Sequence, residues 1–100
     1  MGQMVTLKAE DGHSFGAYRA APAGKPKAGL VVIQEIFGVN SHIRNLSDGF
    51  AADGYVALAP AIFDRAEPGF ETGYQPADIE RGRAVRGKID IGDMVKDIRA

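Results

Sequence analysis

Two short apolar runs with a helical repeat between them restrict the fold more than any other feature of this chain. Residues 30–33 (LVVI) are apolar and largely β-branched, which is typical of a parallel strand buried on both faces. Ile43, Leu46 and Phe50 then recur at the spacing of one helix face. Because residues 55–60 (YVALAP) form a second apolar run, the sequence predicts a strand–helix–strand unit with parallel strands.

Local signals mark the ends of the predicted helix. Asn40 or Ser41 can cap its N-terminus through a side-chain oxygen that accepts a free backbone N–H. Gly54 can end it, since glycine adopts the left-handed conformation without steric cost. The helix is therefore expected between these two points.

The flanking segments complete the predicted order of elements. Residues 4–8 and 14–19 are strand-like and are joined by an Asp-Gly turn, which predicts a β-hairpin. Residues 61–76 contain two prolines and two glycines and are expected to form a long surface loop. Two helices follow, and Asp90 is the expected cap of the second.

The predicted class is α/β, and the pattern is typical of the start of a larger domain. The last predicted helix reaches Ala100 after about two turns. Parallel sheets are normally buried on both faces and continue beyond two strands. We therefore expect residues 1–100 to be the N-terminal portion of a single α/β domain, incomplete in this chain.

Composition disfavours several classes of partner. The formal net charge is −1, from 12 Lys and Arg against 13 Asp and Glu, so nothing favours nucleic acid or an anionic membrane. The chain has no cysteine, its two histidines lie in no carboxylate cluster, and its glycines form no phosphate-binding motif. We expect neither a metal nor a cofactor. The apolar runs are too short to span a membrane and no secretory signal is visible, so a cytoplasmic location is the default expectation.

An ionisable side chain, Glu35, ends the most apolar segment of the chain. In open α/β sheets ligands bind beyond the carboxyl ends of the strands. A carboxylate there lies near a hydrophobic interior and is a candidate for handling protons. It can equally be a structural carboxylate paired with an arginine. Backbone N–H groups of the loop that follows can face a developing oxyanion.

Several motifs together resemble the N-terminal part of the dienelactone hydrolase family. They are QEIFGVN followed by a predicted helix, then DGYVALAP and IFDR, with DGHSFGAY in the opening hairpin. The resemblance covers nearly all of residues 5–65. It implies the α/β-hydrolase fold and hydrolysis of an ester or lactone through an acyl-enzyme, by a Cys-His-Asp triad. Since the chain has no cysteine and no nucleophile elbow, the triad is expected outside these residues.

The resemblance also implies roles for three consecutive residues. Glu35 matches the glutamate that contacts the resting thiol and helps to convert it to thiolate. Ile36 matches the residue whose backbone N–H forms one arm of the oxyanion hole, and Phe37 matches an aromatic residue that lines the pocket.

Substrate contacts are less well defined by the resemblance. The family's carboxylate-bearing lactone implies arginines near the pocket, and Arg81, Arg83 and Arg86 lie in the appropriate part of the chain. We place Arg81 and Arg83 among the substrate-binding candidates, with Tyr74 at the entrance. The structural alternative is that these arginines form a solvated helix face.

The expected partners are a small-molecule ester or lactone and the remainder of the hydrolase domain. Two alternatives stay open. In the first alternative the chain is a non-catalytic module that binds a small acid or a protein. In the second it is a nucleotide-binding strand–helix–strand piece, and the absence of a phosphate loop disfavours this alternative.

Overall fold

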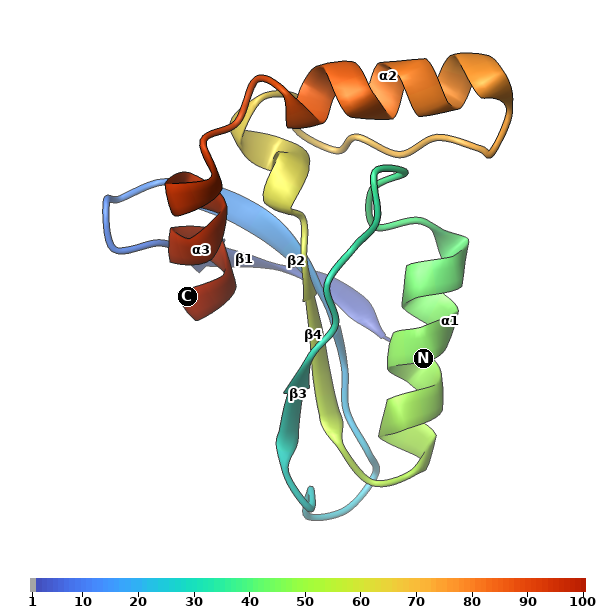
Figure 1. The fold of residues 1–100 in the computed structure, drawn as a ribbon. Coiled ribbons are helices and arrows are strands. Elements are labelled where there is room, and N and C mark those ends of the chain that lie inside the picture. Colours follow the sequence, from blue (N-terminus) through green and yellow to red (C-terminus); the bar gives the residue numbers. More distant parts are fainter. Residues whose placement is uncertain (1) are drawn as a thin grey trace.

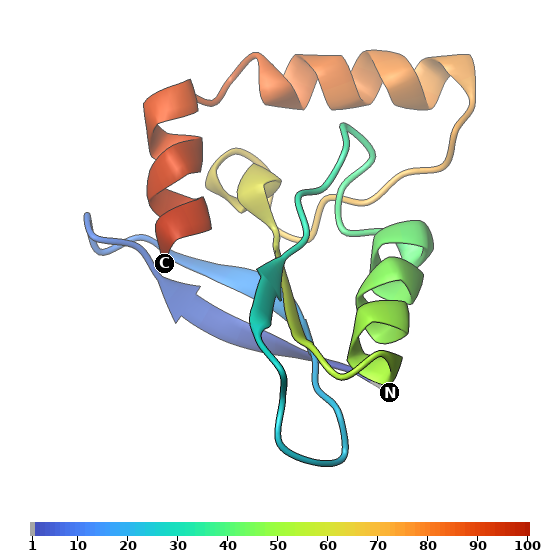
Figure 2. The same ribbon diagram turned by 60° about the horizontal axis from the view of Figure 1, so that its bottom comes forward.

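The computed structural model describes residues 2–100 and shows one mixed sheet with α1 and α3 on opposite sides (Figures 1 and 2). Helix α2 crosses above the end of the sheet where β3 and β4 finish (Figure 1). The elements are β1 (Gln3–Lys8), β2 (Ser14–Ala20), β3 (Gly29–Val31), α1 (Ser41–Ala52), β4 (Val56–Pro60), the 3₁₀ turn η1 (Ile62–Arg65), α2 (Pro76–Arg86) and α3 (Ile91–Arg99). The predicted α/β class is confirmed.

The sheet has the strand order β1-β2-β4-β3. Strands β1 and β2 form the predicted antiparallel hairpin, and its turn residue Gly12 has a φ of 89°, which glycine tolerates. Strands β3 and β4 are parallel, with Leu30 beside Ala57, as the strand–helix–strand pattern predicts. Strand β2 joins the two halves because it also pairs antiparallel with β4.

Helix α1 begins and ends where the sequence predicts. Of its predicted apolar face, Ile43 is buried and Phe50 packs partly buried against the core, and Leu46 departs from the prediction. The Asn40 side chain accepts the Ile43 N–H at 3.1 Å, and Gly54 has a φ of 102° just after the helix. The buried residues are Ile43, Ser47 and Ala51, whereas Leu46 is 41% exposed. These three recur every four residues. Alanines at the sheet surface below them, among them Ala57, allow a close approach of helix and sheet.

The prediction of a doubly buried strand at residues 30–33 is wrong. Strand β3 ends at Val31, and Val31 and Ile33 are 51% and 47% exposed. Their neighbour Val32 is buried on the α1 side of the sheet. The reason is that β3 is an edge strand in the described residues, with β4 on one side. On the face away from α1, the end of α3 lies near Val31 across a pocket and does not cover it.

The segment 61–76 is not the surface loop that its composition predicts. It contains η1, and three of its apolar side chains are buried with residues of α2 and α3. Phe63 and Phe70 meet edge-on with their ring centres 5.5 Å apart. The members of this second cluster are Ile62, Phe63, Phe70, Val85 and Met94. The cluster therefore connects α2 and α3 to the end of the sheet.

An ion-pair network also holds α3 in place. Arg65 in η1 donates to both oxygens of the buried Asp97 in α3, at 2.8 and 3.0 Å. The same guanidinium reaches Asp11 in the hairpin turn at 2.9 Å. The two carboxylates raise the pKa of Arg65 above its usual value. Three segments remote in sequence are thus joined through one guanidinium.

Candidate active site

The motif QEIFG forms a tight turn that continues β3 beyond the end of the sheet (Figure 1). The Gly38 N–H donates to the Glu35 carbonyl at 3.2 Å and closes the turn. Gly38 has a φ of 84°, and a Cβ at this position would overlap the carbonyl of Phe70. Thr72 donates its N–H to the Phe37 carbonyl at 3.0 Å. Glycine is therefore required at position 38. The hydrogen bond between Thr72 and Phe37 holds the turn in position.

A small cavity of about 70 Å³ lies against this turn. Its lining comes from four separate elements, and α2 passes over the turn (Figure 1). The walls are mostly apolar, and the two ionisable groups among the lining residues have opposite charge. The lining residues are Gln34, Glu35 and Ile36 from the turn, Ile62 and Phe63 from η1, Arg86 from α2 and Met94 from α3.

Glu35 lines this cavity but is exposed, which corrects the expectation of a carboxylate near a hydrophobic interior. The physical reason is that, within residues 2–100, only part of a wall surrounds its side chain. No cation in these residues forms an ion pair with Glu35, Arg86 included. The alternative of a structural carboxylate paired with an arginine is not observed in the described residues.

Ile36 is half-buried and lines the same cavity. Within residues 2–100 its backbone N–H has no hydrogen-bond acceptor. The preceding carbonyl, that of Glu35, has two donors: the Gln34 side-chain amide at 2.9 Å and the Gly38 N–H at 3.2 Å. A free backbone donor is suited to bind a group that becomes negatively charged.

Phe37 and Tyr74 pack against one another, edge-on, with ring centres 4.5 Å apart. The Tyr74 hydroxyl accepts from the Asn40 side-chain amide at 2.9 Å, so the capping residue of α1 also holds this ring. Tyr74 remains 55% exposed. Neither ring lines the cavity beside Glu35 in the described residues; together they form an aromatic pair next to the turn.

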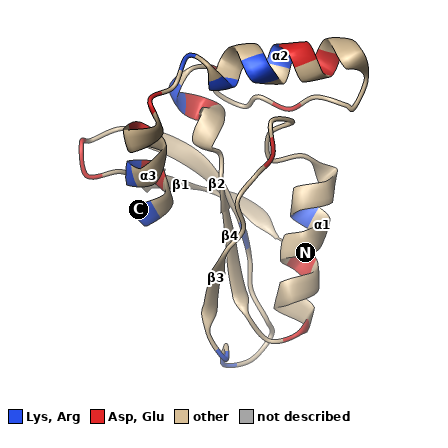
Figure 3. Ribbon diagram, viewed as in Figure 1, with Lys and Arg blue, Asp and Glu red and all other residues tan. Residues whose placement is uncertain are grey.

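The arginines expected at the pocket are distributed differently. Arg81 is exposed, pairs with Glu67 at 3.1 Å and lies over the Phe70 ring. Arg83 is exposed. Among residues 2–100, neither Arg83 nor Arg81 belongs to the lining of the cavity. Arg86, three residues further along α2, does line it. The last turn of α2, which carries Arg83 and Arg86, is the basic end of that helix (Figure 3).

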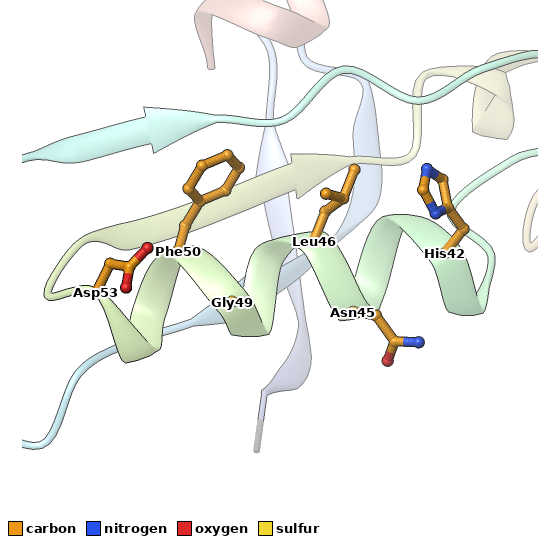
Figure 4. A pocket seen from close by; sticks show the side chains of 6 residues that line it. All are labelled: His42, Asn45, Leu46, Gly49, Phe50 and Asp53. Carbon is orange, nitrogen blue, oxygen red and sulfur yellow. The ribbon is translucent and has the colours of Figure 1, made fainter.

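A larger groove of about 360 Å³ runs along α1 and has a different character. His42, Leu46 and Phe50 project from the same side of the helix, and Asp53 lies at the far end (Figure 4). The histidine lies at the start of α1 and the carboxylate just after its end, eleven positions along the chain, so they do not form a catalytic pair. The groove is therefore no competitor for the site at the QEIFG turn.

Residues 2–100 offer neither a metal centre nor a membrane-spanning helix. No group of three or more His, Asp or Glu side chains lies close enough together to hold a metal ion. None of the helices in this part of the chain has the length and apolar character needed to cross a bilayer.

Solved structures with the same arrangement show the class of protein. A putative dienelactone hydrolase from Klebsiella pneumoniae superposes with a TM-score of 0.75 at 27% identity, over 99% of this chain and 41% of that one. A dienelactone hydrolase-like promiscuous phosphotriesterase from metagenomic libraries has the same fold, with a TM-score of 0.64 at 17% identity. The mixed sheet and the turn beyond β3 thus define an α/β-hydrolase fold.

The family follows from the sequence comparisons: the chain belongs to the dienelactone hydrolase family, whose model matches residues 15–99. It is 51% identical over 71 residues to a putative carboxymethylenebutenolidase of Synechocystis sp. and 35% identical over 103 residues to the carboxymethylenebutenolidase of Pseudomonas putida. These matches cover 71% and 95% of this chain, and the chain spans 29% and 42% of those relatives. The resemblance of the QEIFGVN region is confirmed.

Proposed function

We propose that the protein is a hydrolase of carboxylic esters or lactones that acts through an acyl-enzyme. In this proposal the described residues supply the oxyanion-side turn and the glutamate, and the nucleophile, Asp and His come from outside them. One observation carries it: among residues 2–100 the Ile36 N–H has no acceptor and Glu35 has no ion-pair partner, and both residues line one cavity beyond the end of β3. A carboxylate can accept the proton of a nucleophile, and a free amide can receive the developing oxyanion.

Each group has a defined chemical task. Glu35 accepts the proton of an incoming thiol or hydroxyl, which then attacks the ester carbonyl carbon. The carbonyl oxygen becomes an oxyanion and receives the Ile36 N–H, and a donor of this kind is worth roughly 3–4 kcal/mol of transition-state stabilisation. The tetrahedral adduct expels the alkoxide, which takes up the proton through the histidine of the triad. Water then hydrolyses the acyl-enzyme, which releases the acid and returns a proton to the nucleophile.

The substrate-binding part of the proposal favours one arginine. Phe37 and Tyr74 offer an aromatic surface beside the turn. Arg86 lines the same cavity as Glu35. We therefore propose that Arg86, and not Arg81 or Arg83, binds the carboxylate of the substrate. Arg81 is already engaged with Glu67, which supports this choice.

The free edge of β3 supports the proposed contact with the remainder of a hydrolase domain. Ala28 and Val32 bond to β4, through the Val56 N–H at 3.0 Å and the Leu58 carbonyl at 2.8 Å. Because backbone groups alternate along a strand, those of Val31 and Ile33 face the other way. Exposed edges of this kind pair with a further strand.

The test compares the isolated 100 residues with the complete gene product that contains them, using an activated aryl ester. We expect turnover only from the complete product, and Glu35→Gln is expected to lower its acylation rate. Glu80→Gln, an exposed glutamate on α2, is the matched control. Turnover by the isolated residues would contradict a nucleophile elsewhere. A complete product that binds small carboxylic acids without turnover would instead support the non-catalytic alternative.

A further inference from the structure

Gln34 is a buried polar residue beside the cavity, to which the resemblance assigns no role. Its side chain is only 7% exposed, and its Nε2 donates to the Glu35 carbonyl at 2.9 Å. Only the amide nitrogen can face a carbonyl oxygen, since two acceptors repel one another. The orientation of the side-chain amide is therefore determined by this contact.

The hydrogen bond to Glu35 also sets the direction of a second group. The Glu35 carbonyl and the Ile36 N–H belong to one peptide unit, and no cis peptide occurs among the described residues. In a planar trans peptide the carbonyl and the N–H point in opposite directions. Gln34 and Gly38, which both donate to the Glu35 carbonyl, thus direct the Ile36 N–H away from the turn.

The side-chain oxygen of Gln34 indicates that the residue does not serve to stabilise the fold. Gln34 Oε1 is buried and has no hydrogen-bond partner within the described residues. A buried acceptor without a partner destabilises a fold, whereas an apolar side chain of the same length would leave none. Within the described residues glutamine at this position therefore costs stability, and the interaction that it provides is the one to the Glu35–Ile36 peptide.

We propose that Gln34 is a positioning residue that aims the Ile36 N–H at the oxyanion by holding the Glu35 carbonyl. The assignment rests on the proposed hydrolase function, in which that N–H meets the developing negative charge. Gln34 does not need to touch the substrate. It acts through the orientation of the peptide, and hence on the transition state more than on the bound ester.

The first test uses Gln34→Met in the complete gene product, because methionine keeps the length of the side chain and removes the donor. We expect kcat to fall by about tenfold or more, below the 10²–10³-fold that complete loss of an oxyanion donor produces. KM is expected to stay within about twofold, and the urea midpoint to stay equal or rise. Gln3→Met, on exposed β1, is the matched control and is expected to change neither constant.

Two results of this test would overturn the assignment. One is an unchanged kcat in Gln34→Met. The other is a fall in kcat that accompanies a lower urea midpoint, because that combination indicates a purely structural role. If the unsubstituted gene product has no hydrolase activity, the proposed function fails. A second measurement then tests whether Gln34 orients the Glu35–Ile36 peptide.

That second measurement is the ¹⁵N–¹H residual dipolar coupling of Ile36 in the labelled gene product, which requires no turnover. We expect Gln34→Met to change this coupling while the couplings of β2 and β4 stay as they are. Gln3→Met is expected to leave all of them unchanged. An Ile36 coupling that is the same with and without the Gln34 amide would refute the positioning role.

Discussion

Gly82 of α2 lies directly against the backbone carbonyl of Ile36. A Cβ built on Gly82 would overlap that oxygen and would lie 3.0 Å from the Ile36 Cβ. Glycine is costly inside a helix, so its presence here has a packing reason. The close approach lets α2 bring Arg86 to the cavity that Ile36 lines.

A pair of helical glycines tests this packing. Gly82→Ala is expected to destabilise the protein by about 1–3 kcal/mol, because the added methyl forces α2 away from the turn. Gly49→Ala in α1 is the control, since nothing lies within 4 Å of its added Cβ; we expect it to stabilise by roughly 0.5–1 kcal/mol. Urea midpoints of both variants measure the difference. A Gly82→Ala variant as stable as the parent protein would show that α2 does not rest on Ile36.

The buried ion pair of Arg65 and Asp97 is expected to matter far more than an exposed one. Arg65→Met leaves Asp97, whose side chain is 0% exposed, without its partner, at a cost of about 3–5 kcal/mol. Arg81→Met removes an exposed pair with Glu67 and is expected to cost less than about 1 kcal/mol. Chemical denaturation compares the two. The combined Arg65→Met and Asp97→Leu variant should recover stability, and a failure to recover would argue against an unpaired charge as the cause.

Acid stability should depend on Asp11. The hydrogen bond from Arg65 lowers the pKa of Asp11 from 3.8 to about 2. A carboxyl with a lowered pKa stabilises the folded state above its unfolded pKa, and this contribution is lost as the pH falls from about 4 towards 2. Asp11→Asn is therefore expected to flatten the pH dependence of the unfolding free energy in that interval. Equal slopes in the parent protein and in Asp11→Asn would contradict the prediction.

Arg86 should discriminate between charged and neutral substrates. In the complete gene product, Arg86→Met is expected to lower kcat/KM for a carboxylate-bearing ester by about 10- to 100-fold, since a hydrogen bond to a charged group contributes roughly 1.5–3 kcal/mol. A neutral ester of similar size should be little affected. Arg83→Met, one helical turn earlier, is the control. A larger effect of Arg83→Met on the charged ester would reverse the assignment.

Local chemistry made much of the fold predictable. Asn40 and Asp90 are capping residues whose side chains accept backbone N–H groups of their own helices, so both helix starts could be placed from sequence. The parallel pairing of β3 and β4 followed from two apolar runs on either side of a helix. The burial of Phe63 and Phe70 could not be placed in this way, because it depends on α2 and α3, which are not local partners.

The sequence by itself determined the order of the strands and α-helices, the caps of α1 and α3 and the QEIFG motif that identifies the family, because these depend on neighbours within a few residues. Only the tertiary structure decided that Glu35 is exposed and has no ion-pair partner in the described residues, that Arg86 reaches its cavity, and that Gln34 holds the peptide of Ile36. The exposure of Glu35 and the reach of Arg86 depend on how α2 and η1 pack against the turn. The Gln34 contact spans one residue, but the buried orientation of its side chain is set by the same packing.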